Sequence, residues 1–202
     1  GFLLDLEDLI LRFESSLLAQ GNWSPGDKRL LSGPVQVRRP AGHVGSKDDV
    51  GKIFYFLVKG ATGGNVWGSG VYTNDTNIAV AAVHAGILRT DEKRIVAVRV
   101  LPGQQNYESS TRHGITSSSY GKYDLSYEFV PIDEASLLIE EAGPLSDYND
   151  MVGQSLVFQV TGQTNGALWG TGIYTLDSNL AVAAVHAGLV RPGETAAVLV
   201  EF

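Results

Sequence analysis

The stretch VWGSGVYT at residues 66–73, followed by AAVHAG at residues 81–86, decides the fold of this chain. A second version of the two motifs, LWGTGIYT and then AAVHAG, stands at residues 168–175 and 183–188. Around them, residues 51–100 align with residues 153–202 without a gap, and the likeness continues upstream with a one-residue slip. Self-similarity at a fixed spacing indicates a duplicated structural unit, so the chain contains two copies of one module.

The second copy is shorter than the first. Copy one continues through residues 101–130, whereas copy two stops at Phe202, about thirty residues short of a full repeat. The expected organisation is therefore an N-terminal helix and linker at residues 1–33, module 1 at 34–130, a linker at 131–140 and an incomplete module 2 at 141–202.

Each copy has the pattern of an α+β module that is mainly β. Runs of β-branched and aromatic residues predict strands at residues 53–58, 66–72, 95–101 and 125–130 in copy one, and at 155–160, 168–174 and 197–202 in copy two. The dipeptides Gly63-Gly64 and Asn165-Gly166 favour a type I′ turn, so we expect a hairpin that joins the first two strands of each copy.

An alanine-rich helix follows the second strand in each copy, at residues 77–85 and 179–187. Asp75 and Asp177 precede the helices and are expected to cap them, while Gly86 and Gly188 stand where a left-handed residue ends a helix. These short helices are apolar nearly all round, so each is predicted to lie at the centre of an irregular sheet. The apolar residues of the N-terminal segment instead have the spacing of an amphipathic helix. They are Phe2, Leu6, Leu9, Ile10, Phe13, Leu17 and Leu18.

Composition excludes several classes of function. The net charge is -7, the pI is about 5.0 and the Lys and Arg residues are scattered, which argues against nucleic acid as a partner. No apolar run is long enough for a membrane span. The absence of Cys excludes thiol catalysis, Cys-based zinc sites and disulfides. We predict no metal site and no cofactor.

The two motifs resemble the LCCL domain, and so does the tail of copy one, with Leu101-Pro102-Gly103, Gly114-Ile115 and Ser117-Ser118. The resemblance covers nearly all of copy one and two thirds of copy two. It implies a compact β fold around the AAVHAG helix and a secreted or cell-surface protein that binds ligands, with lipid or saccharide recognition suggested and no common enzymatic activity. The family usually carries disulfide-forming cysteines, one of them just ahead of AAVHAG, where this chain has Ala79 and Ala181.

His84 and His186 are the obvious candidates for catalysis. We interpret them as structural core residues, because a single His in a buried alanine-rich helix more often bonds backbone groups than acts as a base. Ser69, Asp75 and His84 could be drawn as a triad, but Ser69 is Thr171 in the other copy and no GxSxG elbow is present. The asparagines and aspartates before the helices are too few to bind calcium.

Aromatic residues are the candidates for ligand binding. Trp67 and Tyr72, with Trp169 and Tyr174 in copy two, either pack in the core or form a stacking surface, and their odd separation sends one of each pair to each face of a strand. A second candidate surface, in copy one alone, combines Tyr107, Tyr120 and Tyr123 with Arg112.

The sequence therefore predicts a non-enzymatic binding or assembly protein of the cell exterior. A free strand edge in the incomplete module 2 would recruit another segment, so we expect self-association into an oligomer or filament by donation of a strand or helix. Residues 1–40 do not resemble the missing tail, but residues 35–37 have strand character. The alternatives are a carbohydrate- or lipid-binding adhesion module and a hydrolase that uses His84.

Overall fold

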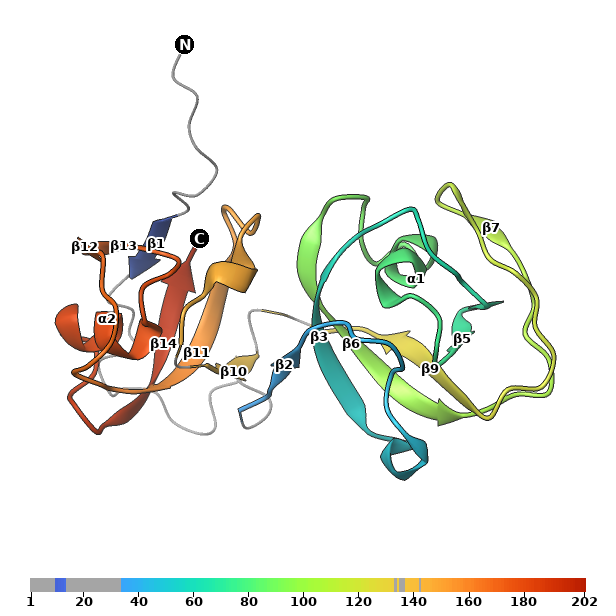
Figure 1. Cartoon of the computed structure of the whole chain (residues 1–202), viewed down its shortest axis with the longest axis horizontal. Helices are drawn as coiled ribbons and strands as arrows, with labels where there is room; N and C mark the ends of the chain where they lie inside the picture. The colour runs from blue at the N-terminus through green and yellow to red at the C-terminus, as the bar shows by residue number, and fades with distance from the viewer. Residues whose placement is uncertain (1–9, 14–33, 133, 135–136, 142) are drawn as a thin grey trace, which may run out of the picture. The chain divides into compact units, whose positions relative to one another are not determined.

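The computed structural model describes residues 10–13 and 34–202, apart from residues 133, 135–136 and 142 (Figure 1). The chain divides into two compact units. Module 1 comprises Val37–Ile132, and module 2 comprises Asp133–Phe202 together with the described residues up to Gln36. Each is mainly β with one short α-helix, as the sequence predicts.

Module 1 is built on a six-stranded sheet in the order β2-β3-β6-β9-β5-β4. Its strands are β2 (Val37–Arg38), β3 (Ile53–Lys59), β6 (Lys93–Pro102), β9 (Leu125–Val130), β5 (Val71–Thr73) and β4 (Gly68–Ser69). β2 runs parallel to β3 and every other neighbouring pair is antiparallel. The long connection from β6 to β9 carries a small hairpin of β7 (Thr111–Arg112) and β8 (Ile115–Thr116).

Module 2 repeats this sheet strand for strand, in the order β10-β11-β14-β1-β13-β12. Its strands are β10 (Leu138–Glu140), β11 (Ser155–Thr161), β14 (Thr195–Glu201), β1 (Ile10–Phe13), β13 (Ile173–Thr175) and β12 (Gly170–Thr171). β10 lies in the expected linker 131–140, but its Leu138 and Ile139 are buried and it pairs in parallel with β11. That part of the linker therefore belongs to the module.

The AAVHAG motifs form the expected helices, α1 (Ile78–His84) and α2 (Leu180–His186). Gly86 and Gly188 have φ of 76° and 75°, so both helices end in the left-handed residue that the sequence predicts. Asp75 and Asp177 are not the caps. Asn77 Oδ1 accepts from the amides of Ala79 and Val80, and Asn179 takes the same role, because these residues stand directly before the first helical turn.

The expected hairpin between the first two strands is wrong. β3 pairs with β2 and β6, and two strands of the sheet separate it from β5. The VWGSGVYT motif instead folds on itself as β4 and β5 around Gly70, whose φ is 83°. Gly64 lies close to the start of the helix, where a side chain would not fit, since a Cβ there would lie 2.9 Å from Asn77 Nδ2.

The described part of the expected N-terminal amphipathic helix is a strand instead. Residues 10–13, at the centre of the expected helix, are strand β1, which lies among the strands of module 2 (Figure 1). The rest of the expected helix and the linker at 21–33 lie outside the described residues. β1 pairs with β13 and β14 of its own chain, so the open sheet edge expected in module 2 is occupied in this structure.

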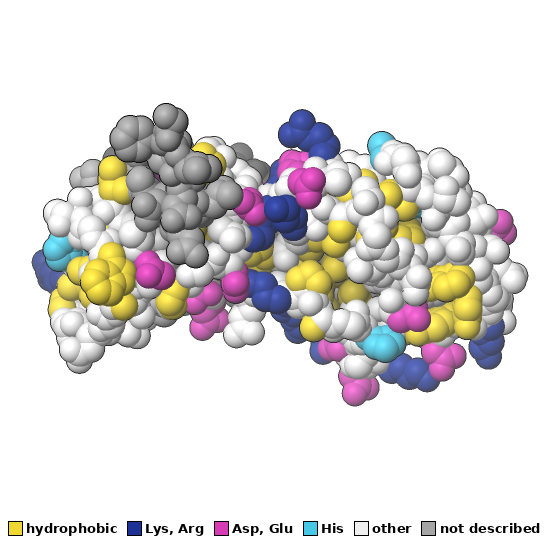
Figure 2. All heavy atoms as spheres, turned by 45° about the horizontal axis from the view of Figure 1, so that its top comes forward, with side chains coloured by type: hydrophobic (Ala, Val, Ile, Leu, Met, Phe, Trp, Pro, Cys, Tyr) yellow, Lys and Arg dark blue, Asp and Glu magenta, His cyan; other side chains and the backbone are white. Residues whose placement is uncertain are grey.

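Each module has its own core around its helix. Val80 and Val83 of α1 are 1% and 3% exposed and pack with Tyr72 and Tyr127 of the sheet. In α2, Val182 is buried but Val185 is only half-buried. On the face shown in Figure 2, Lys and Arg side chains are interspersed with Asp and Glu, in agreement with the scattered charge of the sequence.

Candidate functional site

The imidazole of His84, the last residue of α1, is enclosed in module 1. Tyr72 Oη lies 2.9 Å from His84 Nδ1, and Ser110 contacts Nε2 through its Oγ at 3.1 Å and its carbonyl oxygen at 3.2 Å. His113 Nδ1 lies 3.1 Å from the carbonyl oxygen of His84. Burial lowers the pKa of His84, and the nearby positive charges of Arg112 and His113 lower it further, against the opposing hydrogen bond to Ser110. The ring is fully inaccessible to solvent.

Ser69, Asp75 and His84 do not form a triad. Ser69 Oγ lies 2.8 Å from Ser110 Oγ rather than against the imidazole, and Asp75 is hydrogen bonded to Tyr123. A tyrosine hydroxyl, not a carboxylate, faces Nδ1 of His84. The network joins the loop that contains Ser110 to the end of α1.

Module 2 keeps half of this network. Tyr174 Oη lies 2.8 Å from His186 Nδ1, but His186 is exposed. In module 1 Ser110, on the connection from β6 to β9, contacts the histidine, and among the described residues no equivalent contact reaches His186.

The aromatic candidates separate into core and surface residues. Tyr72, Tyr107 and Tyr174 are almost completely buried, so their rings face the interior. Trp67 is half-buried and packs edge-to-face on Tyr120 at 5.4 Å between ring centroids. Trp169, its counterpart in module 2, is 57% exposed. Arg112 is exposed on the β7–β8 hairpin.

β1 occupies in module 2 the position that β9 occupies in module 1. β9 lies between β6 and β5, and its residues 126–128 pair with Thr73, Tyr72 and Val71. β1 lies between β14 and β13, and its residues 10–12 pair with Thr175, Tyr174 and Ile173, which are the repeat counterparts of those three residues. The register is therefore the same in both modules.

The residue types in this position also correspond. Phe13 stands opposite Val200, as Phe129 stands opposite Val98. Arg12 stands opposite Glu201, as Glu128 stands opposite Arg99 with the charges exchanged. In module 1 the pair is a salt bridge of 2.9 Å. The N-terminal segment thus supplies the strand that occupies the β9 position of module 2.

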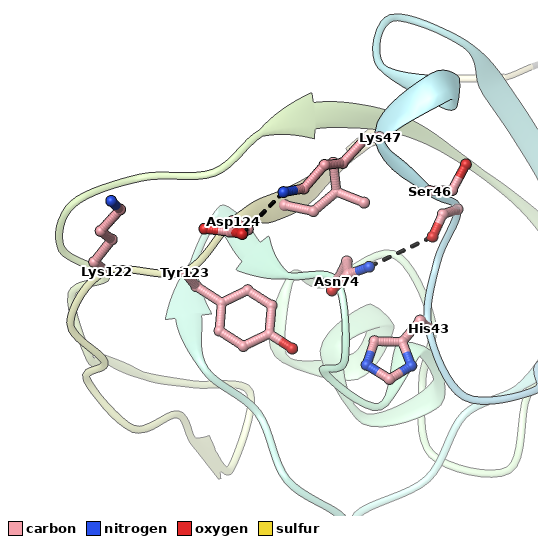
Figure 3. A pocket seen from close by; sticks show the side chains of 9 residues that line it. His43, Ser46, Lys47, Asn74, Lys122, Tyr123 and Asp124 are labelled. Carbon is pink, nitrogen blue, oxygen red and sulfur yellow. Dashed lines mark hydrogen bonds and ion pairs between the residues drawn. The ribbon is translucent and has the colours of Figure 1, made fainter.

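A pocket of about 480 Å³ opens in module 1 at the start of β9 (Figure 3). Its main polar lining residues are His43, Lys47, Asn74, Lys122, Tyr123 and Asp124. Figure 3 shows the Lys47–Asp124 pair on one side and the rings of Tyr123 and His43 on the other, with Asn74 between them. The nitrogen and oxygen of the pair are 3.0 Å apart, and the Lys47 hydrogen bond holds the pKa of Asp124 below its usual range.

Sequence reasoning includes Tyr123 in a candidate surface but misses the other pocket residues. They come from three separate loops and share no motif. A comparison of the two copies would have drawn attention to one of them, because Asn74 is Leu176 in copy two.

The pocket, the His84 network and β9 all lie in or beside the segment that a family comparison recognises. Residues 58–127 match the LCCL domain. This LCCL segment runs from the end of β3 into β9, and LCCL domains are binding modules of secreted or extracellular proteins. Copy two lies outside the matched residues, and its likeness to the LCCL segment rests on the internal repeat and the shared strand order.

No curated protein matches the chain significantly. In the described part of the chain, no helix is long and apolar enough to cross a membrane.

Proposed function

We propose that this chain is a non-enzymatic binding and assembly protein of the cell exterior, in which the LCCL-like module 2 is completed by a donated strand. The observation that carries the proposal is the position of β1, which takes the place and register of β9 although it comes from the opposite end of the chain. The match of residues 58–127 to the LCCL domain supports the binding role.

The geometry of the acceptor position favours donation. β13 and β14 do not pair with each other, and each pairs with β1 instead. Without β1, the inner edges of both strands would present unpaired backbone groups, which recruit other chains. Module 2 therefore depends on a segment that is remote in sequence.

The donor strand need not come from the same chain. The backbone pairing and the residue pattern that define the register are identical in every copy of the protein. Exchange of an identical element between protomers costs little free energy and is a common route to oligomers. Residues 10–13 of one copy can therefore complete module 2 of another, and repeated exchange extends a dimer into a filament.

Chemical cross-linking tests the proposal, because the chain has no Cys of its own. Arg12→Cys with Glu201→Cys places one thiol on the donor strand and one on the acceptor, and a short bis-maleimide joins neighbouring thiols. We expect covalent dimers and larger products that increase with protein concentration. The matched control is Arg99→Cys with Glu128→Cys, the equivalent pair inside module 1, which should give only intramolecular products.

A purely intramolecular product from Arg12→Cys/Glu201→Cys, combined with a monomeric sedimentation profile at every concentration, refutes assembly by strand exchange. Absence of any cross-link, while the module 1 control reacts, refutes the acceptor position itself.

A further inference from the structure

The pocket of module 1 contains a polar group that the fold does not require. Asn74 is only 6% exposed, and its Nδ2 makes one long hydrogen bond of 3.5 Å to the carbonyl oxygen of Gly45. Its Oδ1 has no hydrogen-bond donor among the described residues. A buried polar atom without a partner costs free energy, which argues that something other than folding keeps the amide here.

The second copy shows that the backbone role of this position does not need asparagine. The carbonyl oxygen of Asn74 accepts a hydrogen bond of 2.8 Å from Val44, and that of Leu176 accepts one of the same length from Leu145. Leu176 is as well buried as Asn74. The fold therefore accepts leucine at this position, so the amide of Asn74 is available to bind a ligand in the pocket.

The rim of the pocket combines two cations with one carboxylate. Lys47 is paired with Asp124, whereas Lys122 forms no ion pair among the described residues. Asp124 stays ionised because the Lys47 hydrogen bond lowers its pKa. Lys122 thus offers a cation without an ion-pair partner among the described residues at the mouth of this pocket, in a protein whose net charge is -7.

The ring of Tyr123 forms a fixed wall. Its hydroxyl is hydrogen bonded to Asp75, and burial together with that carboxylate raises the pKa of Tyr123. Tyr120 packs edge-to-face against it at 5.7 Å between centroids. An aromatic face held in this way suits the apolar face of a sugar ring.

These groups select one class of ligand. A bare phosphate or sulfate offers mainly acceptors and a lipid chain offers no hydrogen-bonding groups, so neither would supply donors to Asp124 and Asn74 Oδ1. A sugar offers hydroxyl donors to Asp124 and to Asn74 Oδ1, and a carboxylate on the ring would pair with Lys122. The volume of about 480 Å³ lies within the usual range for small-molecule sites.

We infer that the pocket binds an acidic sugar, a pyranose ring that carries a carboxylate. The inference rests on the binding role proposed above, but it involves module 1 alone and is independent of strand exchange in module 2. Its failure would therefore leave the cross-linking result unaffected.

The test is a titration of the isotopically labelled full chain followed by NMR, with D-glucuronate as the probe, neutral D-glucose and inorganic sulfate as comparisons. We expect glucuronate to shift the amide signals of residues 43–47, 74 and 122–125 and to bind roughly tenfold more tightly than glucose, the ratio that one charge-assisted hydrogen bond supplies. Sulfate should bind more weakly than glucuronate.

Three variants make the test specific. Asn74→Leu introduces the residue of copy two, so it should fold and lose binding. Lys122→Ala changes an exposed side chain and should reduce glucuronate affinity to that of glucose. Leu176→Asn, the reverse change in module 2, should leave binding unchanged. Equal affinity for glucose and glucuronate, sulfate binding as tight as glucuronate binding, or full binding by a folded Asn74→Leu chain would overturn the inference.

Discussion

The hydroxyl of Tyr72 lies 2.9 Å from Nδ1 of His84, and this contact joins β5, the second strand of the VWGSGVYT motif, to the last residue of the AAVHAG helix. The same contact recurs at 2.8 Å between Tyr174 and His186. The two motifs that mark the repeat are thus linked by one hydrogen bond, which explains why both copies contain tyrosine and histidine at this spacing. Among the residues that the structure describes, a further residue closes the other side of the ring only in module 1, where it is Ser110.

Replacement of His84 by Gln should destabilise module 1 by about 1–3 kcal/mol, because it leaves buried polar groups of Tyr72 and Ser110 without their partner. His186→Gln should cost less, since His186 is exposed and has only the tyrosine contact among the described residues. Calorimetric unfolding of the two variants beside the parent measures the difference. A chain that loses binding but no stability on His84→Gln would show that the histidine is functional.

Stability of module 1 should decrease as the pH falls below 6.5. Burial lowers the pKa of His84 in the folded state, so the unfolded chain, with the ordinary value of 6.5, takes up a proton first. The stabilisation is fully present above pH 6.5 and is lost as the pH falls toward the folded-state pKa. Melting temperatures between about pH 7.5 and about pH 5 should show this slope in the parent and less of it in His84→Gln.

The two carboxyl groups with shifted pKa values titrate below this pH range. Hydrogen bonds from Lys52 and Ser46 hold the pKa of Asp49 at about 2, and Lys47 lowers that of Asp124. A parent chain whose melting temperature is independent of pH, or a slope that His84→Gln leaves unchanged, would contradict the assignment to His84.

The sequence was sufficient for the local elements and insufficient for some of the pairings. The alternation of Leu125, Tyr127 and Phe129 predicts β9 with its observed bounds, and the alanines with Gly86 predict α1 to within one residue at each end. The pairing of β3 with β6 joins strands far apart in the chain, and no turn signal marks such a contact. Gly63-Gly64 therefore suggested a hairpin although Gly64 is required by the approach of Asn77.

β1 was missed for a different reason. The apolar residues around Ile10 satisfy a helical period, but the acceptor position in module 2 imposes an extended backbone on residues 10–13. One signal was present in the sequence: Leu9 and Phe13 have the same spacing as Leu125 and Phe129 at the two ends of LSYEF. The pocket residues had no comparable signal, because loop positions carry no periodicity.

A charge introduced into the helix should affect the stability of the two modules differently. Val83→Asp places a carboxylate at a position that is 3% exposed, so it should unfold module 1. Val185→Asp is the matched change in module 2, where the side chain is half-buried and the charge can reach water, so its module should remain folded with a lower melting temperature. Calorimetry with two resolved transitions checks both. Unchanged melting of the Val83→Asp chain would place α1 outside the core.

The last prediction concerns the charge pair that distinguishes the donated strand from the built-in one. The register places Arg12 opposite Glu201 and Glu128 opposite Arg99, so the two modules carry the same cross-strand pair in opposite polarity. Arg12→Glu puts like charges opposite each other and should destabilise module 2 by about 0.5–1 kcal/mol. Glu201→Arg alone should do the same, and the double variant, which reproduces the polarity of module 1, should recover most of the loss.

Thermal unfolding of the four chains at low and high salt measures the coupling, which salt should weaken. The equivalent cycle at Arg99 and Glu128 is the control, since that salt bridge is 2.9 Å long and joins β6 to β9, which both belong to residues 37–132. If the module 1 cycle shows coupling and the Arg12–Glu201 cycle shows none, residues 10–13 do not occupy the β9 position in solution.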